Sequence, residues 1–166
     1  NGVSKGFAMT GWRGGIMAAP KWIAQACDKM QGQFTSATSS ITQKAMHKAM
    51  ELDYPTYIQP MRDAFLKRRD LVYALMKDIP GLKTNLPQGA FYFYPEVCYY
   101  FGKKCGTYHI QNATDLSLYL LDEAHVALVP GAAFGDDKYI RFSYATSEAN
   151  LIEALKRMKE ALAKLQ

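Results

Sequence analysis

A long amphipathic stretch near the middle of this 166-residue chain divides it into two parts with different patterns. From Met61 to Asp78, apolar residues recur three or four positions apart, which predicts a single helix that ends at Pro80–Gly81. The expected buried side of this helix consists of Met61, Phe65, Val72, Leu75, Met76 and Ile79. Its expected solvent side consists of Lys67, Arg68, Arg69 and Asp70.

The residues on either side of this helix predict a mixture of helices and strands. Before it, we expect a buried strand over Trp12 to Ala19 and a helix that begins near Pro20. A polar turn over Gln33 to Ser40 should separate this helix from a second one, which is capped by Ser39 or Ser40 and runs to about Met50. After it, the predicted strands are residues 83–86, 90–94, 126–129 and 139–143, with a loop over 99–112. The predicted helices are 114–124, capped by Thr114, and a C-terminal helix capped by Ser147. The first is expected to bury Leu116, Leu120 and Leu121, and the second a stripe of Leu151, Leu155, Met158, Leu162 and Leu165.

The composition excludes several classes of protein. Hydrophobic residues make up 49% of the chain, but no apolar run approaches the ~20 residues that a membrane-spanning helix needs. The net charge of +5 includes Lys67-Arg68-Arg69, which we interpret as a solvated helix face because no nucleic-acid-binding module accompanies it. The three cysteines lack metal-ligand spacing, so we expect no metal site and reduced thiols in a cytoplasm.

Lys5 and Arg13 lie eight positions apart across a segment of small residues, Ser4-Lys5-Gly6-Phe7-Ala8-Met9-Thr10-Gly11-Trp12-Arg13-Gly14-Gly15. A lysine amine can condense with an aldehyde as a Schiff base, and a guanidinium can hold a phosphate through two charge-assisted hydrogen bonds. This pair therefore suits a cofactor that carries both groups. A solvated lysine near a chain end is the alternative interpretation.

A second candidate group is Arg141, which follows a Pro-Gly turn and lies among apolar residues. The segment Val126-Ala127-Leu128-Val129-Pro130-Gly131-Ala132-Ala133-Phe134-Gly135 leads into Tyr139-Ile140-Arg141-Phe142-Ser143-Tyr144. A charge among Tyr139, Ile140, Phe142 and Tyr144 is costly to bury without a partner, which favours a role in binding a carboxylate. An edge-strand arginine that points into water is the alternative.

These segments resemble the class I/II aminotransferases, the pyridoxal-phosphate enzymes of fold type I that include aspartate aminotransferase. Residues of the Lys5 segment that suit the family pattern are Gly2, Val3, Ser4, Lys5, Ala8, Met9, Gly11, Arg13 and Gly15. Leu86-Pro87-Gln88-Gly89-Ala90-Phe91-Tyr92-Phe93-Tyr94-Pro95 resembles the entry to the family's small domain. The chain departs from the pattern at Gly14 and Ile16, and Gly2 replaces a phosphate-binding serine of other branches.

The resemblance implies an α/β fold made of the C-terminal end of the large cofactor-binding domain (1–60), a long interdomain helix (61–80) and the small C-terminal domain (81–166). It implies amino-group transfer between an amino acid, with aspartate expected, and a 2-oxo acid. Lys5 would be the catalytic lysine, Ser4 and Arg13 would bind pyridoxal 5'-phosphate with it, and Arg141 would grip the substrate α-carboxylate. It also implies a cytoplasmic homodimer.

The family's aspartate at the pyridine nitrogen and most of its phosphate loop precede the lysine, so we expect this sequence to be the C-terminal part of a longer enzyme. By itself it is expected neither to retain the cofactor tightly nor to turn over. Two alternatives stay open: a related enzyme such as a β-lyase or an aromatic-amino-acid transaminase, and an aminotransferase-like domain of a transcriptional regulator. A helix-turn-helix segment upstream would favour the regulator.

Overall fold

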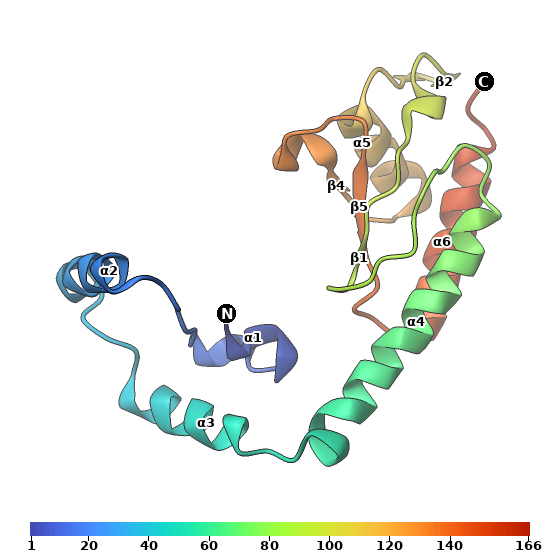
Figure 1. Ribbon diagram of the computed structural model, residues 1–166. Helices are drawn as coiled ribbons and strands as arrows, with labels where there is room; N and C mark the ends of the chain where they lie inside the picture. The colour runs from blue at the N-terminus through green and yellow to red at the C-terminus, as the bar shows by residue number, and fades with distance from the viewer. The chain divides into compact units, whose positions relative to one another are not determined.

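The computed structural model describes residues 1–166, which divide into two compact units, Asn1–Arg62 and Asp63–Gln166. Figure 1 shows the first unit in blue and cyan and the second in green to red. The first unit is helical, whereas the second combines helices with a small antiparallel sheet. The chain is therefore a mixed α/β protein, as the sequence predicted.

The first unit consists of short helices joined by irregular segments. They are α1 (Val3–Gly6), the 3-10 turn η1 (Thr10–Trp12), α2 (Lys21–Phe34), α3 (Ser40–Met50) and the π-helical turn η2 (Tyr54–Ile58). Only Val3, Thr42 and Ala49 are buried in this unit. The two predicted helices are present, but α2 continues to Phe34, into the region expected to be a polar turn.

The buried strand predicted over Trp12 to Ala19 is wrong. One isolated bridge, between Gly2 and Gly15, is the only β-pairing in this stretch, and Ile16 and Met17 are exposed. The physical reason is that a strand needs a neighbouring strand to satisfy its backbone groups, and the first unit contains none. The segment is apolar, as its sequence shows, but no strand of this unit pairs with it.

Helix α4 (Gln59–Lys77) agrees with the predicted long helix to within two residues at its start. Pro60 lies in the first turn, where its missing N–H breaks no helical hydrogen bond. Val72 and Met76 are buried, as expected. Arg69 was expected to face water; its side chain is instead only 21% exposed, donates to Asp70 Oδ1 through Nε (2.9 Å) and Nη2 (2.7 Å), and also donates to the Pro87 carbonyl.

The sheet of the second unit is antiparallel and has the order β1-β5-β4. Its strands are β1 (Tyr92–Phe93), β4 (Val129–Pro130) and β5 (Ile140–Ser143), so β5 lies in the centre. Tyr92 pairs with Ser143 and Phe93 with Phe142, while Val129 pairs with Arg141. Successive side chains of β5 alternate between a buried face (Ile140, Phe142) and an accessible face (Arg141, Ser143).

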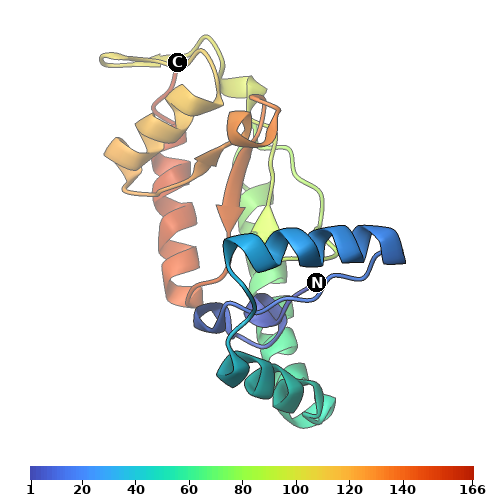
Figure 2. The same cartoon turned by 90° about the vertical axis from the view of Figure 1, so that its left-hand side faces the viewer.

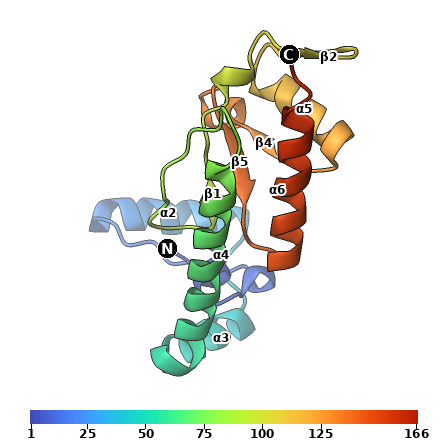
Figure 3. The ribbon, with the colours of Figure 1, turned by 90° about the vertical axis from the view of Figure 1, so that its right-hand side faces the viewer.

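Other strand predictions hold only in part. Residues 83–86 form no strand, because a single bridge from Lys83 to Glu96 is their only pairing. The predicted loop over 99–112 contains a hairpin of β2 (Lys104–Cys105) and β3 (Tyr108–His109), preceded by the 3-10 turn η3 (Cys98–Tyr100). Gln166 and Lys104 exchange backbone hydrogen bonds of 2.7 and 3.1 Å, so the C-terminus lies beside this hairpin (Figures 2 and 3).

Two helices complete the second unit, α5 (Ala113–Ala124) and α6 (Glu148–Leu162). The predicted cap Thr114 is wrong: Asn112 caps α5, because its side-chain oxygen accepts from the backbone N–H groups of Thr114 and Asp115. Ser147 caps α6, as expected. Helix α4 runs alongside α6 (Figure 3), and Lys67 Nζ lies 3.0 Å from a Glu148 carboxylate oxygen.

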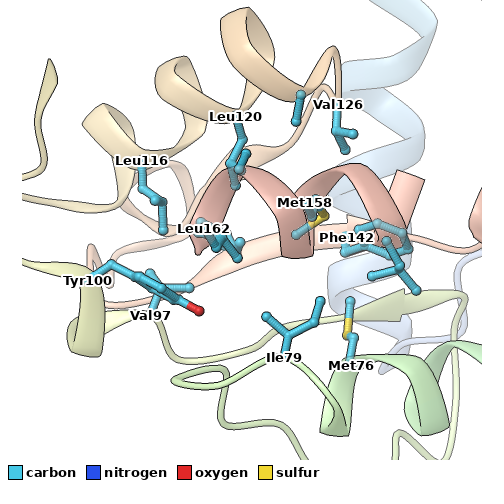
Figure 4. Close-up of a cluster of buried hydrophobic side chains, with 14 of the residues drawn as sticks. Met76, Ile79, Val97, Tyr100, Leu116, Leu120, Val126, Phe142, Met158 and Leu162 are labelled. Atoms are coloured by element: carbon cyan, nitrogen blue, oxygen red, sulfur yellow. The ribbon is translucent and has the colours of Figure 1, made fainter. Parts of the chain in front are cut away.

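One hydrophobic core joins these elements (Figure 4). Met76 and Ile79 meet Phe142 from one side, while Leu116, Leu120, Met158 and Leu162 come from α5 and α6. The whole predicted stripe of α6 is buried: Leu151, Leu155, Met158, Leu162 and Leu165. Leu121 was expected to point inward with Leu116 and Leu120, but it is 45% exposed because it lies on the outer face of α5.

No helix of the structure combines the length and the apolar character needed to cross a bilayer. No group of three or more His, Cys, Asp or Glu side chains is arranged to hold a metal ion. All three cysteines are free thiols, with Cys27 exposed and Cys98 and Cys105 half-buried.

Candidate active site

Residues 1–16 form a closed loop that carries three of the four predicted site residues. Ile16 N donates to the Asn1 carbonyl at 2.7 Å, and Asn1 N donates to the Ile16 carbonyl at 2.8 Å. Gly2 and Gly15 form the adjoining bridge, and a Cβ at Gly15 would lie 3.2 Å from the Asn1 oxygen. The closure therefore leaves little room for a side chain at Gly15, and Ser4, Lys5 and Arg13 all lie within the loop that it closes.

Lys5 lies on the short helix α1. Val3 is fully buried, Ser4 is half-buried and Lys5 is exposed. Phe7 N closes the turn by donating to the Val3 carbonyl at 3.2 Å. The buried Val3 thus anchors the turn, and the adjacent Ser4 and Lys5 are presented from a fixed backbone.

Arg13 has a left-handed backbone, with φ 53° and ψ 48°. Ala8, in the same loop, has φ 54°. Non-glycine residues in this region cost free energy and are concentrated at catalytic and ligand-binding sites. Arg13 Nη1 donates to the Thr10 carbonyl at 3.0 Å, which draws the guanidinium back over its own loop. The strained backbone and this hydrogen bond together favour a functional role for the loop.

Helix α3 supports the loop at Gly14, one of the positions where the chain departs from the family pattern. A Cβ on Gly14 would lie 2.3 Å from Met46 Sδ and 3.0 Å from Thr42 Cγ2. Thr42 Oγ1 donates to the Trp12 carbonyl at 3.0 Å. The close approach of α3 therefore gives a physical reason for glycine at this position.

Arg141 belongs to the second unit and lies at the centre of β5. Its side chain is half-buried on the accessible face of the sheet, whereas Ile140 and Phe142 lie on the opposite, buried face. The sequence analysis expected Arg141 to be surrounded by Tyr139, Ile140, Phe142 and Tyr144. Ile140 and Phe142 do not surround it, because adjacent side chains of a strand point to opposite faces of the sheet.

The aromatic neighbours of Arg141 come from β1 and from the 3-10 turn after β4. Arg141 Cζ lies 4.5 Å from the centroid of the Tyr92 ring and 4.6 Å from that of Phe134. Neither residue was a predicted site residue. Both lie inside motifs that the sequence analysis singled out, Leu86–Pro95 and Val126–Gly135, but cross-strand register was needed to place them beside Arg141.

Phe134 is supported by two tyrosines on the same face. Tyr94 meets Phe134 edge to face at 6.2 Å and stacks on Tyr139 with a centroid distance of 4.9 Å and an interplanar angle of 7°. The Tyr94 hydroxyl donates to the Gly131 carbonyl at 3.3 Å. Desolvation, followed by the nearby Asp136 carboxylate and Tyr139, raises the pKa of Tyr94 above its usual value, so this hydroxyl stays protonated and remains a donor.

Comparison with known proteins shows the family to which this chain belongs. The family model for aminotransferases of class I and II matches residues 1–158. A bifunctional aspartate aminotransferase and glutamate/aspartate-prephenate aminotransferase of Petunia hybrida is 48% identical over 165 residues, which cover 98% of this chain and 34% of that protein. An aspartate aminotransferase of Rhizobium meliloti (strain 1021) is 43% identical over 166 residues, 99% of this chain and 40% of that protein.

Solved structures show the same similarity. The crystal structure of the aspartate aminotransferase of Rhizobium meliloti matches all of this chain and 42% of its own, with a TM-score of 0.93 and 42% identity. An aromatic aminotransferase of Pyrococcus horikoshii matches 98% of this chain and 42% of its own, with a TM-score of 0.86 and 38% identity. The chain thus spans 34–42% of the length of these relatives. It belongs to the aminotransferases of class I and II and has the fold of the corresponding part of a fold-type I aminotransferase.

Proposed function

We propose that this chain takes part in amino-group transfer between an amino acid, with aspartate as the preferred substrate, and a 2-oxo acid, with pyridoxal 5'-phosphate as cofactor. The observation that carries the proposal is the closed loop of residues 1–16, which presents an amine and a guanidinium from one strained, anchored segment. Relatives that cover almost the whole chain at 38–48% identity are named aspartate or aspartate/prephenate aminotransferases. Their names support the reaction class and the substrate.

The donor set of the loop fits pyridoxal 5'-phosphate. Arg13 and the Ser4 hydroxyl offer hydrogen-bond donors for a phosphate dianion, and Lys5 offers an amine for the aldehyde. When bound, the cofactor supplies an aldehyde that accepts amino groups and a ring that withdraws electrons from the substrate Cα. The residues of this chain provide the rest: Arg13 and Ser4 anchor the phosphate end, and Lys5 holds the aldehyde end and then moves the proton at the substrate Cα.

Arg141 binds the α-carboxylate that the amino-acid and oxo-acid substrates share. A guanidinium presents parallel N–H groups that match the two oxygens of a carboxylate. The half-buried position on β5 lowers the local dielectric around this pair and strengthens the contact. Arg141 thereby fixes the orientation of the substrate Cα–H bond, which a lysine base needs in order to act on the proton.

We further propose the domain assignment that the family implies. Residues 1–60 belong to the large domain, 61–80 to the interdomain helix and 81–166 to the small domain. The division of the structure at Arg62/Asp63, inside α4, supports this assignment. A homodimer and a cytoplasmic location are carried over from the family in the same way.

The names of several relatives also support a second 2-oxo-acid substrate. The Petunia hybrida relative carries prephenate in its name as well as aspartate and glutamate, and two Rickettsia relatives are named probable aspartate/prephenate aminotransferases. We therefore propose prephenate as the alternative 2-oxo acid. A substrate panel of aspartate, glutamate and an aromatic amino acid against 2-oxoglutarate and prephenate separates the two.

The experiment is a hybrid enzyme in which this chain replaces the matching 40% of the Rhizobium meliloti aspartate aminotransferase. We expect the hybrid to transaminate aspartate, and the 166-residue chain alone to lack this activity. Borohydride reduction of the hybrid with its cofactor, followed by peptide mapping, should label Lys5. Lys5→Ala should abolish both label and activity, while Lys21→Ala, an exposed lysine of α2, should change neither. A label on another lysine would refute the assignment.

Arg141→Leu provides the second arm of the test. Loss of one partner of a buried charge pair costs about 2–5 kcal/mol, so kcat/KM for aspartate should fall accordingly while the cofactor stays bound. Arg157→Leu is a suitable control because Arg157 pairs with Glu153 on the exposed side of α6. Equal kinetics for Arg141→Leu and the unmodified hybrid would exclude Arg141 as the carboxylate ligand.

A further inference from the structure

The guanidinium of Arg141 contacts two aromatic rings, one from a strand and one from a 3-10 turn. Tyr92 belongs to β1, and Phe134 ends the 3-10 turn η4 (Gly131–Phe134), which directly follows β4. Strand β1 pairs with one edge of β5 and β4 with the other, so the two rings come from segments on either side of β5 in the sheet order. Arg141 Cζ lies 4.5 Å from one centroid and 4.6 Å from the other, and the two rings make no ring contact with each other.

These distances are within the range of favourable cation–π contacts, which extends to about 6 Å. Such contacts use the faces of the rings and occupy no hydrogen-bond acceptor of another residue. None of the Arg141 nitrogens forms a hydrogen bond or ion pair with another residue. The arrangement therefore restrains the guanidinium while leaving its N–H donors without a partner in the chain.

The two rings are themselves held in place. Tyr92 lies in the paired segment of β1, opposite Ser143, and its ring contacts Phe91 at 4.5 Å. Phe134 is 51% exposed but lies on a turn that has no room to adjust. Gly131 N donates to the Tyr139 carbonyl at 2.7 Å, and a Cβ on Gly131 would lie 2.0 Å from the Asp136 oxygen.

We propose that Tyr92 and Phe134 are positioning residues, which hold the Arg141 guanidinium in one plane so that its edge takes a carboxylate with both N–H groups. This inference rests on the proposed role of Arg141 as the α-carboxylate ligand. An arginine side chain has several rotatable bonds, and ordering it at the moment of binding weakens the complex. The clamp orders it beforehand, for amino-acid and oxo-acid substrates alike.

Two consequences follow for measurement. Protons of Arg141 that lie over ring faces are shielded, so the Nε–H signal should be shifted upfield from that of a solvated arginine. Removal of either ring should weaken carboxylate binding about three- to fivefold, the size of one cation–π contact together with part of the ordering cost. The variant that lacks both rings should bind the carboxylate no more tightly than the single variant that binds it less tightly.

The test uses the 166-residue chain and sodium acetate as the carboxylate, with sodium chloride at equal concentration as the reference. NMR spectra give the Arg141 Nε–H shift, and the amide signals of Ile140 and Phe142 report the acetate titration. The variants are Tyr92→Leu and Phe134→Leu, with Tyr92→Phe and Phe134→Tyr as conservative partners. Tyr99→Leu is the matched control, because Lys103 Nζ lies 4.3 Å from the Tyr99 ring, away from this face.

We expect an upfield Arg141 signal in the unmodified chain, its loss together with weaker acetate binding in the two leucine variants, and recovery in Tyr92→Phe and Phe134→Tyr. An unshifted Arg141 signal in the unmodified chain overturns the clamp without any variant. Acetate binding by the leucine variants within twofold of the unmodified chain also overturns it, as does a loss in Tyr92→Phe equal to that in Tyr92→Leu.

Arg141→Leu separates this proposal from the proposed function. If Arg141→Leu binds acetate as well as the unmodified chain, or if the unmodified chain gives no acetate response, Arg141 is not the carboxylate ligand and the function proposed for it fails. If Arg141→Leu abolishes the response while Tyr92→Leu and Phe134→Leu do not weaken it, the ligand assignment stands and only the clamp fails. Tyr99→Leu should behave as the unmodified chain in both measurements.

Discussion

The two units of this chain differ in how much of their apolar surface they bury. The second unit, Asp63–Gln166, contains the entire core cluster, which draws on α4, the sheet, α5 and α6. The first unit, Asn1–Arg62, buries only Val3, Thr42 and Ala49. Its large apolar side chains are exposed instead: Trp22 at 73%, Phe34 at 78% and Ile41 at 72%.

This contrast separates two kinds of information in a sequence. Helix α2 and helix α3 form where apolar periodicity, Pro20 and Ser39 predict them, because these signals are local, although Ser39 forms no side-chain capping bond. Burial depends on what packs against a helix, and the first unit supplies no such layer for Trp22 or Ile41. The proposed cofactor residues lie in this weakly buried unit, whereas the proposed substrate arginine lies in the unit with its own core.

The largest expected effect follows from separating the two regions. Residues 59–166, which keep α4 whole, should fold alone and unfold cooperatively in urea with a free energy of about 5 kcal/mol or more, as is usual for a domain of this size. Residues 1–58 should show a broad, non-cooperative urea curve and no near-ultraviolet dichroism. A sigmoidal transition of residues 1–58 would show that the first unit has a stability that its burial does not reveal.

Single side chains should reproduce this difference on a smaller scale. Leu155 is buried in α6, so Leu155→Ala should lower the free energy of unfolding of the 166-residue chain by about 2–5 kcal/mol. Trp22→Ala removes a larger side chain from an exposed position and should change the free energy of unfolding by no more than about 0.5 kcal/mol. Urea titrations followed by circular dichroism measure both. A Trp22 effect as large as that of Leu155 would contradict the contrast.

The same division explains which sequence predictions hold. In the second unit the stripe of α6, its Ser147 cap and the central strand with Arg141 were predicted correctly, because the partners of these residues lie in the same chain segment. In the first unit the strand over Trp12 to Ala19 was wrong, because no strand of that unit pairs with it. The family itself was identified from local motifs, which need no tertiary context.

The candidate site shows where local pattern reaches its limit. The roles of Lys5, Ser4, Arg13 and Arg141 stay predictions, and the structure adds the closed loop and the β5 face on which they lie. Tyr92 and Phe134 could not be placed from sequence. They are 49 and 7 positions from Arg141, and the register of β1 with β5 and the fold of the Gly131 turn decide their contact.

Two glycines test how firmly each region holds its backbone. A Cβ on Gly131 would meet the carbonyl oxygens of Asp136 at 2.0 Å and Tyr139 at 2.6 Å, and backbone cannot move aside. Gly131→Ala should therefore lower the free energy of unfolding by about 3 kcal/mol, the upper end of overpacking effects. A Cβ on Gly14 would meet the flexible Met46 side chain, so Gly14→Ala should cost about 1 kcal/mol or less.

Urea titration of the two glycine variants measures these costs, and Gly89→Ala serves as the control because a Cβ there would have open space around it. The Gly131 variant should also lose the upfield shift of Arg141, since the turn that carries Phe134 must move. Equal stability of Gly131→Ala and Gly89→Ala would mean that the turn is more adaptable than its contacts indicate.

The smallest expected effect compares the helix caps of the two regions. Asn112 accepts hydrogen bonds from Thr114 N at 2.9 Å and Asp115 N at 3.0 Å, while Ser39, before α3, forms no side-chain capping bond. Asn112→Ala should lower the free energy of unfolding by about 1 kcal/mol, because two N–H groups at the start of α5 lose their partner. Ser39→Ala should leave it unchanged, since it removes no bond. Thermal unfolding of both variants measures the difference. If Ser39→Ala and Asn112→Ala lowered the free energy of unfolding equally, Ser39 would cap α3 in solution, and the two units would not differ in helix capping.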